Sequence, residues 1–132
     1  MIGGRVLDTS AVLTAATGTN DYTAALLTVA AEHGIVLAVP AAAVQAAWRV
    51  TRSAEQPWLE LLLDSPAVVV VPLTADDARD AGLLAARAGH DDVAAATAHA
   101  VHIAGRRDWS VLTADPGPVL ELDPHVRTET LP

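Results

Sequence analysis

The sequence has no cysteine, no phenylalanine and no lysine, and aromatic residues make up only 3% of it. Without cysteine there is no disulfide framework, no thiolate zinc site and no cysteine nucleophile. Every basic residue is therefore an arginine, eight of them against sixteen acidic residues, and the formal net charge is −8. Such a field repels phosphate backbones, so the composition argues against indiscriminate binding of nucleic acid. The excess of carboxylates suits a divalent cation, a basic partner or simply a solvated surface.

Long hydrophobic runs are also missing. The first residues hold no apolar stretch long enough for a signal peptide, and no later run approaches the roughly 20 apolar residues of a membrane-spanning helix. We therefore expect a soluble protein that works in the cytoplasm. At 132 residues, the chain is expected to form a single domain over residues 1–132, large enough to fold without a disulfide or a structural metal.

Short apolar runs that suit buried strands recur along the chain. The most strand-like is a run of four valines, Val68–Val71, with a proline after it. Runs that are apolar throughout indicate strands covered on both faces, as in parallel sheets. The predicted strands are residues 6–7, 35–39, 68–71 and 110–113, and the tail at 126–131 could add an edge strand.

Helix signals separate these strands. Thr74 followed by Asp77 is close to a capping box, Pro40 suits the first position of a helix, and Thr19 or Asn20 can cap another. Strands that alternate with helices indicate an α/β fold in which a central parallel sheet of four or five strands carries helices on both faces. The predicted helices are residues 10–17, 20–33, 40–52, 57–64, 75–88, 92–103 and 119–122.

Three aspartates are expected at one edge of this sheet. Asp8 follows the first strand, Asp115 follows the strand at 110–113, and Asp92 stands at the start of an alanine-rich helix. Neighbouring parallel strands lie ~4.8 Å apart, so carboxylates at their carboxyl ends can reach one ion. Mg²⁺ prefers such oxygen ligands, and without a cation the three charges would repel one another. Because aspartate is also a common helix cap, a purely structural role for Asp8 is the competing interpretation.

Three short motifs contain these aspartates. They are Val6-Leu7-Asp8-Thr9-Ser10, Asp92-Val93-Ala94-Ala95-Ala96-Thr97-Ala98 and Val111-Leu112-Thr113-Ala114-Asp115. In this order they resemble the acidic motifs of the PIN-domain family, especially the VapC-type toxins of toxin–antitoxin pairs. The resemblance implies a PIN-like three-layer fold, an Mg²⁺ or Mn²⁺ cofactor and endoribonuclease activity on single-stranded or structured RNA. It also implies a cognate antitoxin and a homodimer.

The same resemblance assigns roles to residues and exposes one departure. It implies Asp8, Asp92 and Asp115 as catalytic metal ligands, with Ser10 and Thr113 as hydroxyl groups that assist them. PIN domains usually carry a fourth acid, a Glu on the helix after the second strand, and Ala46 stands at the aligned position. Gln45 is neutral and points about 100° away on a helix. Glu55 and Glu60 lie beyond the predicted end of this helix, so neither is assigned the missing role.

Other candidate residues have simpler structural interpretations. Asp91 could replace Asp92 as the ligand, but it is favoured as the helix cap. His99 and His102 are favoured as residues that flank a buried stripe, because no other His or Cys completes a tetrahedral metal set. Ser10 as a hydrolase nucleophile lacks a Gly-x-Ser-x-Gly elbow. Two further groups could contact nucleic acid but also suit core, interface and helix-end positions: Trp48, Trp58 and Trp109, and Arg49, Arg52, Arg106 and Arg107.

Three function classes remain open. The first is a metal-dependent ribonuclease. The second is a PIN-fold protein with weakened or lost catalysis that acts as a binding module, and Ala46 is its main support. The third is a receiver-like signalling domain, which is also a parallel α/β fold with clustered acids. That class needs a lysine at the end of a late strand, and this chain has none.

Overall fold

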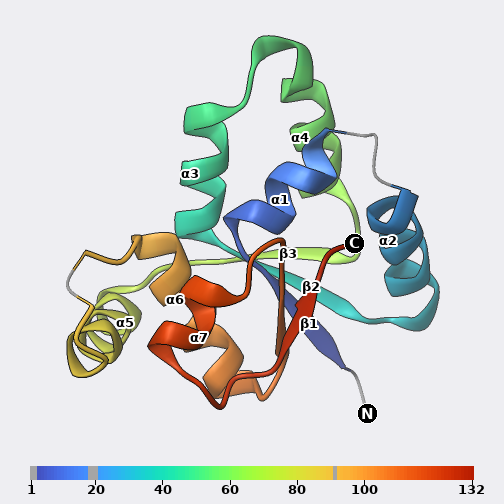
Figure 1. Cartoon of the computed structure of the whole chain (residues 1–132). Helices are drawn as coiled ribbons and strands as arrows, with labels where there is room; N and C mark the ends of the chain where they lie inside the picture. The colour runs from blue at the N-terminus through green and yellow to red at the C-terminus, as the bar shows by residue number, and fades with distance from the viewer. Residues whose placement is uncertain (1–2, 18–20, 91) are drawn as a thin grey trace.

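The computed structural model describes residues 3–17, 21–90 and 92–132 (Figure 1). At its centre is a five-stranded sheet, parallel throughout, in the order β3-β2-β1-β4-β5. The sheet confirms the four predicted strands, the predicted edge strand and the α/β fold class. The strands are β1 (Gly4–Leu7), β2 (Val36–Pro40), β3 (Val68–Val71), β4 (Ser110–Thr113) and β5 (Thr128–Thr130).

Helices cover both faces of this sheet. Figure 1 shows α1, α3 and α4 on one side and α5, α6 and α7 on the other. In the described part of the chain, no helix is long and apolar enough to cross a membrane. The helices are α1 (Thr9–Ala16), α2 (Asp21–His33), α3 (Ala41–Val50), the short 3₁₀ helix η1 (Ser53–Glu55), α4 (Gln56–Asp64), α5 (Ala75–Arg87), α6 (Ala95–Arg107) and α7 (Gly117–Leu122).

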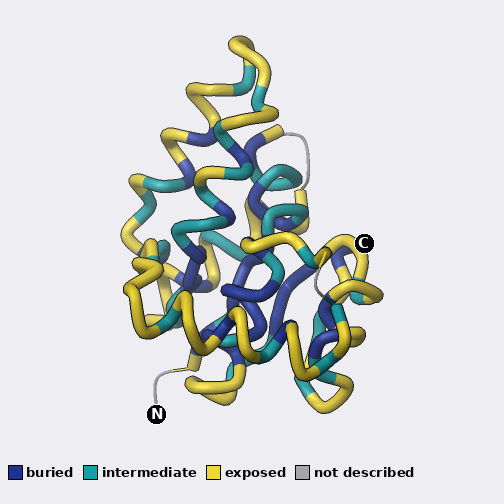
Figure 2. Tube along the Cα trace, turned by 90° about the vertical axis from the view of Figure 1, so that its left-hand side faces the viewer, coloured by how far each residue is buried: buried dark blue, intermediate teal, exposed yellow. Residues whose placement is uncertain are grey.

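Alternation along the central strands builds one core on each face. Successive side chains of a strand point to opposite faces, so Leu7 packs on the α1 side and Val6 on the α6 side. Both are fully buried. Figure 2 shows the buried segments gathered at the centre of the molecule. This two-sided burial explains why the strand sequences are apolar without alternation.

The most strand-like run in the sequence lies at an edge of the sheet rather than in its middle. Strand β3 pairs only with β2 among the described strands, and Val69 and Val70 are 49% and 42% exposed. Four β-branched residues favour the extended backbone wherever the strand lies. Strand propensity therefore predicted the element and carried no information about its place in the sheet order.

Two predicted helix boundaries are wrong. Helix α6 begins at Ala95 rather than at Asp92, and Ala94 precedes it without a side-chain cap. It also runs through Gly105 to Arg107 before Asp108 takes the left-handed conformation with φ 55°. Arginines in the last turn favour this longer helix because they offset the negative end of its dipole. The caps predicted at Thr19 or Asn20 and at Asp91 lie outside the described residues.

Two other helices differ in detail. Helix α3 ends at Val50, before Arg52, because Thr51 is already extended. On α2 the expected apolar side is only partly buried: Ala24 and Ala31 are exposed, whereas Ala30 packs into the core. Alanine has a small apolar surface, so its exposure costs little and its pattern is a weak guide to orientation.

Candidate functional site

Asp8 lies at the carboxyl end of β1, where the chain turns into α1. Its side chain caps that helix, because Oδ1 accepts a hydrogen bond from the Ala11 N–H at 3.0 Å. The residue is only 8% exposed. The free N–H groups and the positive end of α1 stabilise an anion at this position. The capping interpretation of Asp8 is therefore correct. Within the described residues, every hydrogen bond to this carboxylate goes to Oδ1 rather than to Oδ2.

The hydroxyl group of Ser10 joins Asp8 to the neighbouring strand. Ser10 Oγ donates to Asp8 Oδ1 at 2.6 Å and accepts from the Ala114 N–H at 2.9 Å. It also lies 3.3 Å from Thr113 Oγ1. The parallel register of β1 and β4 brings Asp8 and Thr113 to the same edge of the sheet. Ser10 thus ties the ends of two central strands together.

Thr113 fixes the turn that carries Asp115. Its side chain is fully buried, and Oγ1 donates to the Asp115 carbonyl at 3.0 Å while accepting from the Asp115 N–H at 3.1 Å. Asp115 itself is exposed, and its Oδ1 accepts from the Gly117 N–H at 3.0 Å. A Cβ at Gly117 would lie 3.2 Å from that oxygen, so the close approach favours glycine. Together these four residues, Asp8, Ser10, Thr113 and Asp115, form what we call the Asp8–Asp115 network.

Asp92 is not part of this network. It is exposed in the turn before α6 and stands three residues ahead of the first helical residue, so it does not cap that helix. Across residues 3–17, 21–90 and 92–132, no three Asp, Glu or His side chains lie close enough together to hold one metal ion. Ala96, in the first turn of α6, does pack in the same core as Leu7 and Ala11. The loop before α6 therefore leads to the α1 side of the sheet, and the role of Asp92 stays a prediction.

Ala46 occupies the middle of α3, which begins directly after β2. It is half-buried and packs against the core on the α1 side, whereas its neighbour Gln45 is exposed. The expected difference in orientation between these two residues is thus confirmed. A methyl group cannot bind a cation, so α3 contributes no acid here. Glu55 and Glu60 lie in η1 and α4, beyond the end of α3, as predicted.

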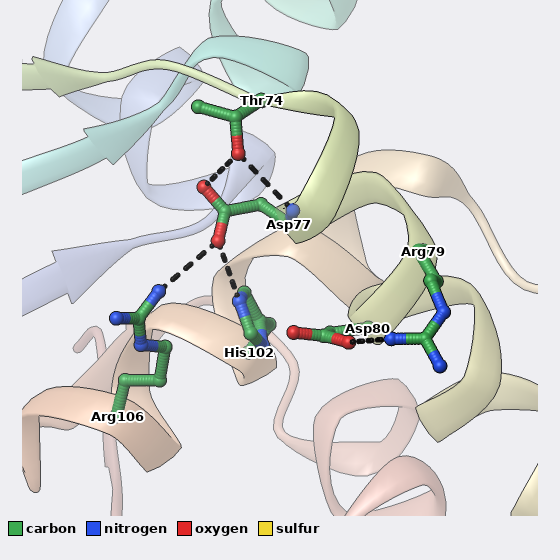
Figure 3. A network of polar contacts seen from close by, with 6 residues as sticks. All are labelled: Thr74, Asp77, Arg79, Asp80, His102 and Arg106. Atoms are coloured by element: carbon green, nitrogen blue, oxygen red, sulfur yellow. Dashed lines mark hydrogen bonds and ion pairs between the residues drawn. The ribbon is translucent and has the colours of Figure 1, made fainter.

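A second polar network, which the sequence did not predict, joins α5 to α6 (Figure 3). Thr74 caps α5 by accepting from the Asp77 N–H at 3.1 Å, which confirms the predicted cap. Asp77 Oδ1 also accepts from His102 Nε2 at 3.0 Å and from Arg106 at 3.2 Å. The hydrogen bond from His102, followed by that from Thr74, lowers the pKa of Asp77 to about 2. Thr74 and Asp77 were visible in the sequence only as a cap.

His99 is buried beside this second network, on the same helix as His102. It is 0% exposed and so lies within the buried stripe that it was predicted to flank, and neither ring nitrogen makes a hydrogen bond of good geometry to the described residues. Burial lowers the pKa of His99, and the nearby charge of Asp77 and the Pro72 carbonyl offset this only in part. The surroundings of His99 therefore favour the neutral imidazole over the charged form.

This burial predicts a loss of stability in acid. Because the pKa of His99 is lower in the folded state, the unfolded chain binds more protons as the pH falls below the ordinary imidazole pKa of about 6.5. The free energy of unfolding should therefore fall as the pH drops through that value. His99→Leu should raise stability by roughly 1 kcal/mol and flatten this decline, since it removes an unsatisfied buried polar group. Denaturant melts at pH 5 to 7.5 measure both effects.

The matched control for this test is the exposed His125. His125→Gln removes an exposed imidazole and should leave the pH dependence as it is in the wild type. If His99→Leu keeps the full acid-induced decline, the neutral state of His99 is not its cause.

An apolar groove of about 470 Å³ lies between α1, α2 and α4. Ala15, Leu27, Trp58 and Leu61 line it, and the last two are 51% and 66% exposed. Large apolar side chains gathered on a surface in this way mark an interaction site. Trp58 therefore fits the predicted interface role, while Trp48 is half-buried against the core.

Comparison with known proteins places the fold. No family model matches the sequence, and no curated protein matches it. One similar structure is that of VapBC2 from Rickettsia felis bound to a DNA fragment from the VapBC2 promoter. Its TM-score is 0.70 at 14% sequence identity, and the match covers 98% of this chain and 99% of the matched chain. PAE2754 from Pyrobaculum aerophilum has a TM-score of 0.68 at 17% identity, and the match covers 97% of this chain and 92% of PAE2754. FitAcB from Neisseria gonorrhoeae has a TM-score of 0.58 at 19% identity, and the match covers 94% of this chain and 95% of the matched chain.

At these identities the likeness is one of fold. The five-stranded parallel sheet and its flanking helices match those neighbours over nearly the full length of both chains. The chain therefore has the PIN-like three-layer fold that its motifs predicted.

Proposed function

We propose that this chain is a metal-dependent endoribonuclease of the VapC-like toxin class, acting in the cytoplasm on single-stranded or structured RNA. Asp8 and Asp115 are the proposed ligands of an Mg²⁺ or Mn²⁺ ion, and Ser10 and Thr113 position them. Asp92 is the proposed third ligand, which the loop before α6 has to bring to the other two when the ion binds. The observation that carries the proposal is the Asp8–Asp115 network, because it fixes two carboxylates at the carboxyl edge of the sheet, where α/β folds bind ligands. The resemblance of the three acidic motifs to those of the PIN-domain family further implies that the protein forms a homodimer.

The donor set fits a hard divalent cation. Asp8 and Asp115 each use Oδ1 for the hydrogen bonds that orient the side chain, and among the described residues none of these bonds goes to Oδ2. Each carboxylate can thus offer one oxygen without losing its support. Bound there, Mg²⁺ or Mn²⁺ would polarise a phosphodiester and lower the pKa of bound water.

The chain's own residues hold the site in place. The Ala11 N–H at the start of α1 orients Asp8, and Ser10 restrains both Asp8 and the backbone at Ala114. Thr113 is buried, so it keeps the Asp115 turn rigid. Such support matters because productive geometry must be held within about 0.5 Å.

The proposal is tested by incubating the purified full chain with single-stranded and hairpin RNA in Mn²⁺, in Mg²⁺ and in EDTA. Cleavage with either metal and none in EDTA is the expected result. Full cleavage in EDTA would overturn the metal requirement. No cleavage under any of these conditions would favour the alternative function below.

A PIN-fold binding module without effective catalysis is the second candidate. Ala46 favours it, because the inward side of α3 supplies a methyl group where PIN domains usually have a carboxylate. Fewer acidic ligands mean weaker metal binding and weaker activation of water. This alternative predicts binding of the partner protein with no RNA cleavage.

We further propose that a cognate antitoxin occupies the apolar groove between α1, α2 and α4. The solved neighbours VapBC2 and FitAB are complexes bound to DNA, which favours a partner protein over a small ligand. The groove suits the apolar face of a partner helix or extended segment, with exposed Trp58 and Leu61 as anchors.

The partner to test is the small protein encoded beside this chain, if one is present. Leu61→Asp should weaken that complex by roughly 30-fold, or ~2 kcal/mol, because it places a charge in the apolar groove. Leu83→Asp, on exposed α5, is the matched control and should bind as the wild type does. Isothermal titration measures both. Equal affinity of the two variants would place the partner elsewhere on the molecule.

A further inference from the structure

A polar pocket of about 430 Å³ lies at the amino-terminal edge of β1 and β4. This is the edge opposite the Asp8–Asp115 network, since Gly4 begins the strand that Asp8 follows. The side chains that line it and carry the proposal below are Arg5, Arg107, Trp109 and Arg127.

Arginines from three separate elements meet at this pocket. Arg5 belongs to β1, Arg107 ends α6 and Arg127 precedes β5, so three of the eight arginines of an acidic chain share one site. Glu129 accepts from Arg5 at 2.6 Å, and Asp108 lies 3.4 Å from Arg127. Across the described residues, the ion pairs involve other basic side chains, and no carboxylate is within ion-pair distance of Arg107. The pocket therefore keeps positive charge that no carboxylate neutralises, in a protein whose net charge is −8.

Trp109 forms a rigid wall next to these arginines. A Cβ at Gly4 would lie 2.6 Å from three atoms of the indole ring, so the ring packs directly on the Gly4 backbone and only glycine permits it. On Trp109, the guanidinium of Arg107 lies 5.4 Å from the ring centroid. A guanidinium stacked on an aromatic ring is held in one orientation, and its outer face stays available for stacking.

We propose that this pocket binds a phosphate-bearing nucleotide. The planar fork of Arg107 suits phosphate oxygens, which it can contact through two parallel N–H bonds. Arg5 and Arg127 add positive charge beside it and keep further N–H groups, although Arg5 already donates to Glu129 and Gly4 and Arg127 to Asp108. The Arg107–Trp109 stack suits the base, because nucleobases stack on guanidinium planes and on aromatic rings. The nucleotide can be a free nucleoside monophosphate or one unit of an RNA strand. Either source presents the same phosphate and base.

This inference does not rest on the proposed ribonuclease activity. The pocket lies at the opposite edge of the sheet, so its binding is measured in EDTA, where metal-dependent cleavage does not occur. The probes are inorganic phosphate, uridine monophosphate and a single-stranded RNA of about ten nucleotides, a length within the site sizes of strand-binding grooves. Each is titrated into the full-length chain by calorimetry at low salt.

Variants of two arginines locate the binding. Arg107→Gln and Arg127→Gln should each weaken uridine monophosphate about tenfold or more, because each removes a charged partner of the phosphate. Arg79→Gln is the matched control, since Arg79 is 73% exposed on α5 and paired with Asp80 away from this pocket. It should bind as the wild type does. Circular dichroism checks that each variant is folded.

The outcomes separate the two sources. Binding of the monophosphate that Arg107→Gln weakens supports a free nucleotide as ligand. Binding of the RNA alone, weakened by the same variants, supports a strand. Binding of neither probe, binding of phosphate only, or equal loss with Arg79→Gln overturns the proposal. Binding of an acidic peptide at this pocket, where the nucleotide probes do not bind, would also overturn the proposal.

Discussion

Replacing Asp8 by Asn should lower metal-dependent RNA cleavage by about 10²- to 10³-fold while the protein stays folded. Asparagine caps a helix as well as aspartate does, so its amide oxygen can still accept from the Ala11 N–H and from Ser10. What disappears is one negative charge beside the proposed ion. Loss of one fixed electrostatic partner of a transition state costs roughly 3–4 kcal/mol. Single-turnover cleavage in Mn²⁺, with a thermal melt in EDTA, measures the two effects separately.

A control removes the same charge away from the site. Asp123 is the C-cap that follows α7 and its Oδ1 accepts from the His125 N–H, so Asp123→Asn tests the general effect of a lost carboxylate. Its cleavage rate should equal that of the wild type. If Asp8→Asn cleaves as fast as Asp123→Asn does, Asp8 serves only as a helix cap.

The same assay decides between the two adjacent aspartates before α6. Asp92 was preferred over Asp91 because of its place in the alanine-rich motif. Asp92→Asn should therefore reduce cleavage to the level of Asp8→Asn, while Asp91→Asn should leave it unchanged. The opposite pattern would assign the ligand to Asp91 and contradict the motif alignment.

The elements that the sequence predicted best are those determined by local chemistry. Buried parallel strands must be apolar on both faces, so short runs such as 35–39 and 110–113 were visible without a structure. The start of α6 was missed because Ala94 gives no capping signal, whereas Asp91 and Asp92 resemble a cap. The edge position of β3 was also beyond prediction, because strand order depends on contacts between distant segments.

The candidate site divides in the same way. Asp8 and Asp115 could be grouped from sequence because each follows a strand and adjacent parallel strands end at one edge. The family resemblance implied Ser10 and Thr113 beside them, and it also implied Asp92, which the structure does not bring into the network. The network of Asp77 with His102 could not be grouped from sequence, since 25 residues separate them and only the packing of α5 on α6 brings them together. The cationic pocket around Trp109 likewise needs three elements to meet. Arginines that come from separate elements to one pocket leave no periodic signal in the sequence.

Replacing Ala46 by Glu should raise metal-dependent cleavage tenfold or more. Ala46 lies on the inward, half-buried side of α3, so the new carboxylate adds a hard oxygen ligand where the PIN family usually has one. Each ~1.4 kcal/mol of added transition-state stabilisation changes the rate tenfold. In EDTA the extra charge should repel the nearby aspartates and lower the melting temperature. Mn²⁺ should then raise that temperature more than in the wild type.

Gln45→Glu is the matched control, because it adds the same charge one residue away on the exposed side of α3. It should change neither the cleavage rate nor the Mn²⁺-induced shift in melting temperature. Equal Mn²⁺-induced shifts in both variants would mean that position 46 does not face the metal. A wild-type rate that Ala46→Glu cannot improve would mean that three carboxylates suffice for catalysis. If neither protein cleaves RNA although Ala46→Glu binds Mn²⁺ more tightly, the chain is a binding module, because a fourth acidic ligand restores metal binding without restoring the reaction.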